Sequence, residues 1–161
     1  MPFGSGLRLP VAMAAALFLS GCVSATDVFG DARQGYLNPA RAADADFARA
    51  ETVPVTLSEY AFAPAALSVK AGRPYVLRLE NKGTKAHFFS SVPFFKAIAV
   101  RSLSGHAGQG EIAAPYLKTI GLAAGETREL AFVPLAKGTY DFECTAPFHA
   151  DFGMTGTVTI E

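Results

Sequence analysis

Apolar and polar residues alternate along short runs from Thr52 onward, and Gly and Pro residues separate these runs. In the run GTYDFEC, residues 138–144, the side chains of Tyr140, Phe142 and Cys144 fall on one face. A period of two is typical of a half-buried β-strand. Short strands with turn residues between them predict an all-β antiparallel sandwich or barrel. The other runs of this kind are residues 53–57, 66–69, 75–81, 127–135 and 154–160.

One stretch between these runs departs from the alternation. In the segment VPFFKAIAVRSL, the apolar residues Phe94, Phe95, Ile98 and Leu103 are spaced so that they could line a short helix. A Gly-rich stretch, SGHAGQG, follows. We therefore expect a short helical and loop insertion between strands around residues 94–118.

The N-terminus has the pattern of an export signal. Arg8 precedes the apolar run VAMAAALFL, which is too short to span a membrane comfortably. The tetrapeptide Leu19-Ser20-Gly21-Cys22 follows this run and resembles the lipobox of bacterial lipoproteins. This resemblance implies cleavage before Cys22 and lipid on its sulfur, which holds a protein on a membrane when two or more acyl chains are attached. The alternative is an ordinary signal peptide with a chance cysteine.

Three regions follow from these patterns. We expect residues 1–21 to be the signal peptide, residues 22–50 to be a tether rich in Ala, Asp and Arg, and residues 51–161 to be one folded domain. An ordered extension that packs on the body is the alternative for residues 22–50. The balance of 14 basic and 14 acidic side chains gives no reason to expect nucleic acid as a partner.

The small number of cysteines limits the roles that Cys144 can have. The chain has 2 cysteines, Cys22 and Cys144. If Cys22 carries lipid, Cys144 is the single remaining thiol and no disulfide can form within the mature chain. An unpaired thiol in an exported protein is a liability, so we expect Cys144 to have a ligand.

Cys144, His149 and Met154 follow one another at a spacing of five residues within a single predicted loop. Thiolate, imidazole and thioether are ligands that suit copper better than calcium or magnesium. Two histidines and one cysteine with a weak axial methionine form the blue-copper electron-transfer site. Taken singly, a buried core thiol, a surface histidine and a core methionine are equally good interpretations, but their joint occurrence favours a metal site.

A second histidine is needed, and the chain offers two. His87 follows the strand run that ends at Asn81, whereas His106 lies in the Gly-rich stretch 104–110. Because a metal ligand must be held rigidly, His87 is the better candidate and His106 the alternative.

Residues 55–161 resemble the cupredoxins, the small blue-copper proteins. The resemblance depends on the segments GTYDFECTAPFHADFGMTGTVTI, LENKGTKAH and SEYAFAPAALSVKAGRPYVLRLEN. It implies a Greek-key β-sandwich and one copper ion, Cu(I) or Cu(II), held by His87, Cys144, His149 and Met154. It also implies a docking patch for redox partners that includes Phe148 and Ala150. Many members have Asn after the first ligand histidine, where this chain has Phe88.

Four protein ligands leave no open position on the metal, which argues against enzyme activity. The sequence therefore predicts an electron carrier, expected to be a monomer, that meets periplasmic or membrane redox proteins transiently. It would lie in the periplasm on a lipid anchor, with Val23 favouring the outer membrane. The alternatives are a periplasmic copper buffer or chaperone without electron transfer, and a metal-free interaction domain.

Overall fold

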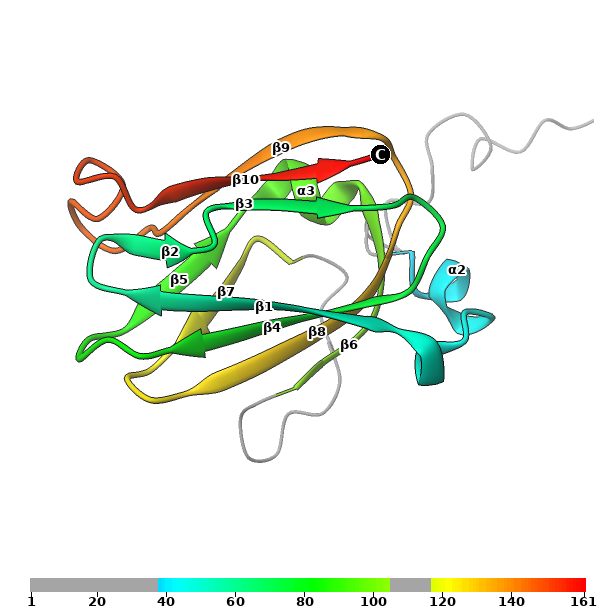
Figure 1. Cartoon of the computed structure of the whole chain (residues 1–161), viewed down its shortest axis with the longest axis horizontal. Helices are drawn as coiled ribbons and strands as arrows, with labels where there is room; N and C mark the ends of the chain where they lie inside the picture. Colours follow the sequence, from blue (N-terminus) through cyan, green and yellow to red (C-terminus); the bar gives the residue numbers. More distant parts are fainter. Residues whose placement is uncertain (1–37, 105–116) are drawn as a thin grey trace, which may run out of the picture. The chain divides into compact units, whose positions relative to one another are not determined.

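Two five-stranded sheets lie face to face in the part of the chain that this computed structural model describes, residues 38–104 and 117–161 (Figure 1). The strand order is β2-β1-β4-β8-β6 in one sheet and β3-β10-β9-β5-β7 in the other. The elements are α2 (Pro39–Ala43), η1 (Phe47–Arg49), β1 (Glu51–Ser58), β2 (Ala61–Ala63), β3 (Ala66–Val69), β4 (Tyr75–Asn81), β5 (His87–Ser90), α3 (Val92–Lys96), β6 (Ile98–Ser104), β7 (Thr119–Leu122), β8 (Thr127–Pro134), β9 (Gly138–Glu143) and β10 (Thr155–Ile160). The expected all-β sandwich is confirmed.

Strand pairing is antiparallel except at two places. β1 pairs with β4 in parallel, and β3 pairs with β10 in parallel, because the chain crosses between the sheets before it returns to each neighbour. The pairing of β9 with β10 is antiparallel and runs from Glu143 opposite Thr155 to Gly138 opposite Ile160. This last pair fixes the two ends of the loop that carries Cys144, His149 and Met154.

The period-two pattern places one face of each strand in a shared core. In β4, Tyr75, Leu77 and Leu79 are buried while the residues between them are half-buried or exposed. Aromatic rings fill the space between the sheets: the ring centroids of Phe89 and Phe142 lie 4.5 Å apart, and those of Phe62 and Phe142 lie 4.9 Å apart. Burial of each such ring stabilises the fold by about 1.5–3 kcal/mol.

The insertion after β5 is less helical than the sequence indicated. α3 ends at Lys96, so Phe94 and Phe95 are helical, but Ile98 and Leu103 lie on strand β6 instead. β6 pairs with β8, and a register irregularity after Val100 lets Leu103 face the core, as Ile98 and Val100 do. The extra residue of this bulge puts Leu103 an odd number of residues after Ile98 on the same face, which breaks the period of two.

Residues 38–50 pack on the body of the domain. Ala42 of α2 is fully buried against Ala99 and Val133, and the Arg101 guanidinium lies 5.1 Å from the ring centroid of Phe47. The ordered alternative therefore describes residues 38–50.

The expected signal peptide, Cys22 and His106 lie outside the described residues, and the three-region division stays a prediction. No helix in residues 38–104 or 117–161 is long and apolar enough to cross a membrane.

Candidate metal centre

Cys144 directly follows β9, and the loop after it is closed by its own main-chain hydrogen bonds. The Cys144 N–H donates to the carbonyl of Met154 at 3.0 Å, and the Met154 N–H donates to the carbonyl of His149 at 2.9 Å. The His149 N–H donates to the carbonyl of Ala146 at 3.1 Å. The main chain of Met154 is thus bonded to both other candidate ligands of the loop, which fixes the spacing between the three residues.

Two residues of this loop have left-handed backbone conformations. Gly153 has φ 97° and permits the turn that precedes Met154, since glycine adopts such angles without a steric penalty. Phe148 has φ 67°, which is unusual for a bulky side chain and costs on the order of 1–3 kcal/mol. This left-handed residue lies directly before His149, whose Nδ1 faces the sulfur of Cys144.

His87 enters the site from a different part of the chain. It is the first residue of β5, opposite Leu122 of β7, and it is fully buried. The preceding loop, residues 82–86, is fixed by Asn81, whose buried side-chain amide donates to the carbonyls of Lys85, Leu122 and Ala123 at 2.8, 3.1 and 2.9 Å. The Asn81 Oδ1 atom accepts from the Gly83 N–H at 2.9 Å. One polar side chain therefore ties three chain segments together behind His87.

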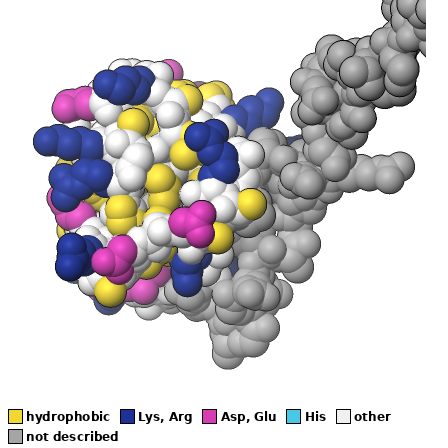
Figure 2. Space-filling view, turned by 90° about the vertical axis from the view of Figure 1, so that its right-hand side faces the viewer, with side chains coloured by type: hydrophobic (Ala, Val, Ile, Leu, Met, Phe, Trp, Pro, Cys, Tyr) yellow, Lys and Arg dark blue, Asp and Glu magenta, His cyan; other side chains and the backbone are white. Residues whose placement is uncertain are grey.

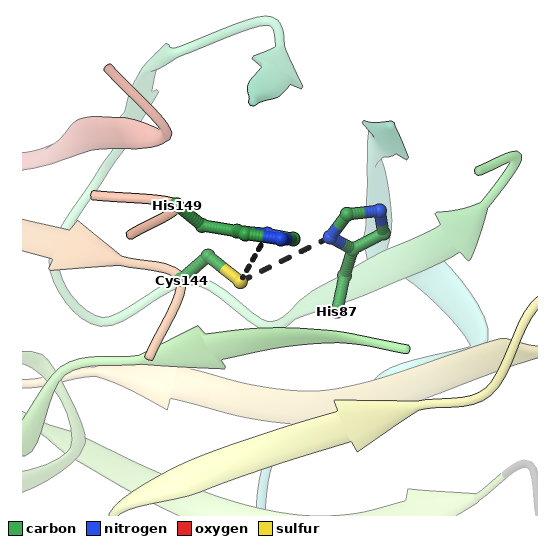
Figure 3. Close-up of side chains that lie close together, drawn as sticks. All are labelled: His87, Cys144 and His149. Carbon is green, nitrogen blue, oxygen red and sulfur yellow. Dashed lines mark hydrogen bonds between the residues drawn. The ribbon is translucent and has the colours of Figure 1, made fainter. Parts of the chain in front are cut away.

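The structure brings His87, Cys144 and His149 together around one point (Figure 3). The Cys144 Sγ atom lies 3.5 Å from Nδ1 of His149 and 3.9 Å from Nδ1 of His87. One donor atom from each residue lies within 4.8 Å of the other two, and all three residues are buried. Both rings turn the Nδ1 edge toward the sulfur, as Figure 3 shows.

These distances fit a first-row metal ion. Metal–sulfur and metal–nitrogen bonds of about 2.3 and about 2.0 Å in a trigonal arrangement separate sulfur from nitrogen by about 3.7 Å. The two observed sulfur–nitrogen distances, 3.5 and 3.9 Å, lie on either side of that value. The donor set of two imidazoles and a thiolate suits copper. Together with the sandwich fold, it indicates a site for a single copper ion.

Met154 is fully buried next to this cluster. Its main chain bonds to Cys144 and His149, as described above. A thioether in this loop would supply a weak fourth ligand to a bound copper ion. The role of Met154 as a fourth ligand stays a prediction.

The Cys144 sulfur also receives a main-chain hydrogen bond. The Phe88 N–H donates to Sγ at 3.4 Å, so β5 is connected to the sulfur through the residue that follows His87. The Phe88 ring is half-buried and packs over Gly121, where an added Cβ would lie 3.1 Å from the ring. The Phe88 ring therefore packs against β7. The loop before His87 is joined to the residue after β7 by the Asn81 amide instead.

Burial and charge set the protonation of His87. Burial lowers the pKa of the His87 imidazole, because a charged ring is poorly solvated there, and the nearby ring of His149 lowers it further. The carboxylate of Glu59 acts in the opposite direction on the same pKa. A neutral His87 has a free nitrogen lone pair, which metal binding requires.

Exposed aromatic side chains surround His149. Phe148 is 70% exposed, Phe152 67% and Tyr60 48%, and these are the large exposed apolar side chains of the described residues. The Tyr60 ring centroid lies 5.2 Å from the rings of both His149 and Phe152, with edge-to-face geometry. Ala150 is half-buried in the same loop. Figure 2 views the right-hand end of Figure 1, away from this loop, where Lys and Arg are interspersed with Asp and Glu.

Sequence reasoning missed four residues of this region: Tyr60, Glu59, Asn81 and Phe152. Tyr60 and Glu59 lie in the turn between β1 and β2, far from the loop in sequence, and no spacing rule connects them to it. A buried Asn at the end of a strand, and an aromatic residue inside the ligand loop, were the available signals for Asn81 and Phe152.

A family model, the cupredoxin-like domain, matches residues 13–160. Among solved structures, a multicopper oxidase from Pseudomonas thermotolerans is 20% identical with a TM-score of 0.55, over 74% of this chain and 31% of that chain. A multicopper oxidase from Campylobacter jejuni, described as a metallo-oxidase, is 17% identical with a TM-score of 0.51, over 68% of this chain and 30% of that chain. Reduced auracyanin from Roseiflexus castenholzii is 20% identical with a TM-score of 0.49, over 70% of this chain and 98% of that chain.

The present chain thus spans about a third of either oxidase. The two oxidase matches support the fold. No curated protein matches the chain.

Proposed function

The chain belongs to the cupredoxin-like domain family, and from this premise we propose that it is a blue-copper protein that carries single electrons between redox partners. The observation that carries the proposal is the buried cluster in which Nδ1 of both His87 and His149 faces the sulfur of Cys144. Bound copper would supply the exchange between Cu(I) and Cu(II). The protein would supply a geometry that suits both states.

Hydrogen bonds that fix the backbone around the site support this role. The main-chain bonds of Cys144, His149 and Met154 hold the ligand loop, and the Asn81 amide holds the loop before His87. A site held in this way needs little rearrangement when charge changes, because its hydrogen-bonding groups are already oriented. Electron transfer is faster when less has to move.

We propose that the protein has no enzyme activity of its own. Two histidines, one cysteine and one methionine would occupy all four ligand positions, whereas metal-assisted catalysis needs an open one. The oxidases that share the fold are about three times longer than the region they share with this chain. Their activity is therefore not assigned to it.

Partners would meet the protein at the aromatic rim of the site. His149 is 9% exposed, while His87 is fully buried, so the ring of His149 is the nearer of the two to solvent. We propose that Phe148, Ala150, Phe152 and Tyr60 form the docking patch around it. Small, transient interfaces are typical of redox partners.

We also propose that the protein works in the periplasm, attached to a membrane by lipid on Cys22, with Val23 favouring the outer membrane. A full-length Cys22→Ala protein should then move from the membrane to the soluble fraction. Membrane association that survives this substitution contradicts the anchor.

The spectrum of the copper-loaded protein tests the main proposal. With Cu(II) added, we expect strong visible absorption from the copper–thiolate bond, a reversible one-electron wave in voltammetry, and loss of the absorption in Cys144→Ser. Tight, colourless Cu(I) binding without a redox wave would instead identify a copper-handling protein. A spectrum that Cys144→Ser leaves unchanged contradicts both copper–thiolate roles.

A further inference from the structure

The imidazole of His87 has one nitrogen that the copper site does not use. Its Nδ1 faces the Cys144 sulfur, so Nε2 points away from it (Figure 3). Among the described residues, His87 Nε2 is the buried side-chain nitrogen or oxygen that has no hydrogen-bond partner. When a histidine holds a metal through Nδ1, the ring proton is on Nε2, and this N–H normally donates to a carboxylate, a carbonyl or water.

Glu59 places a carboxylate on this side of the ring. Its Oε1 atom accepts from the N–H of Thr84 at 2.6 Å and from the Thr84 hydroxyl at 2.9 Å. These bonds attach the turn between β1 and β2 to the loop that precedes His87. The hydrogen bond from the Thr84 N–H is the main reason that the pKa of Glu59 is lowered to about 2, so the group is ionised at neutral pH.

Gly83 keeps open the space between the two side chains. A Cβ atom at this residue would lie 2.6 Å from Nε2 of His87 and 3.0 Å from each of the two carboxylate oxygens of Glu59. The imidazole nitrogen and the carboxylate therefore approach the same point, and any residue with a side chain would fill it. The absence of a Cβ at residue 83 is what lets them face each other.

We propose that Glu59 is a positioning residue for the metal site: its carboxylate accepts a hydrogen bond from the Nε2–H of His87, directly or through one water. This inference rests on the proposed function, in which Nδ1 of His87 holds copper. The carboxylate fixes the ring in the tautomer that leaves Nδ1 free, and it makes the imidazole a stronger electron donor. Its negative charge also favours Cu(II) over Cu(I), since opposite charges attract.

The tautomer of His87 in the metal-free protein is the first test. Nitrogen-15 NMR of the full-length protein, at a pH where His87 is neutral, distinguishes a proton on Nε2 from one on Nδ1. We expect the Nε2–H form in the wild type and a larger share of the Nδ1–H form in Glu59→Ala. An Nδ1–H form in the wild type overturns the proposal whether or not copper binds.

The reduction potential is the second test. Glu59→Gln removes the charge and keeps an oxygen that can accept from Thr84. We expect the ratio of Cu(I) to Cu(II) at a fixed applied potential to rise at least tenfold, a shift of about 59 mV for a one-electron couple. The matched control is Glu80→Gln, which removes the same charge from a half-exposed side chain paired with Lys82 at 3.5 Å.

The outcomes separate this inference from the proposed function. A wild-type protein without copper–thiolate absorption overturns the proposed function, and the tautomer of the metal-free protein still decides the role of Glu59. Normal absorption with a shift in Glu59→Gln no larger than that in Glu80→Gln overturns the role of Glu59 alone. A shift in Glu59→Gln clearly larger than that in Glu80→Gln, in a protein that keeps its copper–thiolate absorption, supports it.

Discussion

Cys144, His149 and Met154 owe their positions to a few main-chain hydrogen bonds within one loop. The sequence made these three residues predictable because they are close together and chemically related. It could not show that Phe148 has a left-handed backbone, since nothing in its neighbours requires a φ of 67°. In the structure this left-handed residue lies directly before His149, whose Nδ1 faces the sulfur.

Met154→Leu tests the fourth ligand at the scale of one side chain. Leu and Met have similar volumes, so the loss of stability should stay below about 1.5 kcal/mol. Copper should remain bound, and the potential should rise by at least about 59 mV, a tenfold change in the Cu(I) to Cu(II) ratio, because a sulfur donor that stabilises Cu(II) is gone. Voltammetry measures this. An unchanged potential means that the thioether is not a ligand.

Glu59 should contribute stability in a defined pH range. In the folded protein its pKa is about 2, against an ordinary value of 4.5. The unfolded chain therefore takes up this proton first as pH falls, and the contribution is complete above pH 4.5 and disappears toward pH 2. Urea unfolding of the metal-free wild type and of Glu59→Gln should show a difference that shrinks over this range. A difference that stays constant with pH contradicts the assignment.

At the scale of secondary-structure elements, the strands β4 and β5 and the loop between them place His87 next to the other ligands. The sequence placed His87 near the end of the strand run that closes at Asn81, and the structure makes it the start of the next strand, β5. The period of two could not show this, because a side chain fixes the loop between the two strands. The Asn81 amide donates hydrogen bonds to the carbonyls of Lys85, Leu122 and Ala123. β6 was missed for a related reason, since its bulge hides the period of two.

Asn81→Ala should therefore loosen the site without touching a ligand. Three carbonyls would lose their donor, and a buried group left unsatisfied costs about 1–3 kcal/mol. We expect the metal-free protein to lose about 2–4 kcal/mol by urea unfolding, on the order of one or two such groups, and the copper-loaded form to show a broadened visible band. A loss below about 1 kcal/mol would mean that water replaces the amide easily.

At the scale of the whole molecule, the exposed aromatic side chains gather at the end of the sandwich that holds His149. Tyr60 comes from the turn between β1 and β2, and Phe148 and Phe152 from the ligand loop. Apolar side chains that are grouped and exposed are typical of an interaction surface. The fold thus presents the most exposed ligand ring within such a surface.

Phe148→Asn tests this surface. Asn tolerates the left-handed backbone of residue 148, so the loop should keep its shape while the exposed ring is lost. We expect an unchanged spectrum and potential, and electron self-exchange at least tenfold slower, measured by NMR line broadening in mixtures of Cu(I) and Cu(II) protein. Ala136→Asn, an exposed substitution in the turn between β8 and β9, is the control. Equal rates in the two variants contradict a docking role for Phe148.

The sequence by itself determined the class of fold and most of the metal site. Alternation with a period of two is a local property, and so is the spacing of Cys144, His149 and Met154. The prediction of copper as the metal followed from the chemistry of the ligands, which depends only on residue type.

Only the tertiary structure decided which groups from distant segments meet at that site. Glu59 and Tyr60 reach it from the first hairpin, and Asn81 and Gly83 reach it from the end of β4. Contacts between segments far apart in the chain depend on how the two sheets pack and cross, and no single sequence period records this. The groups that surround the ligands therefore depend on the tertiary fold, whereas the ligand loop could be predicted from its own residues.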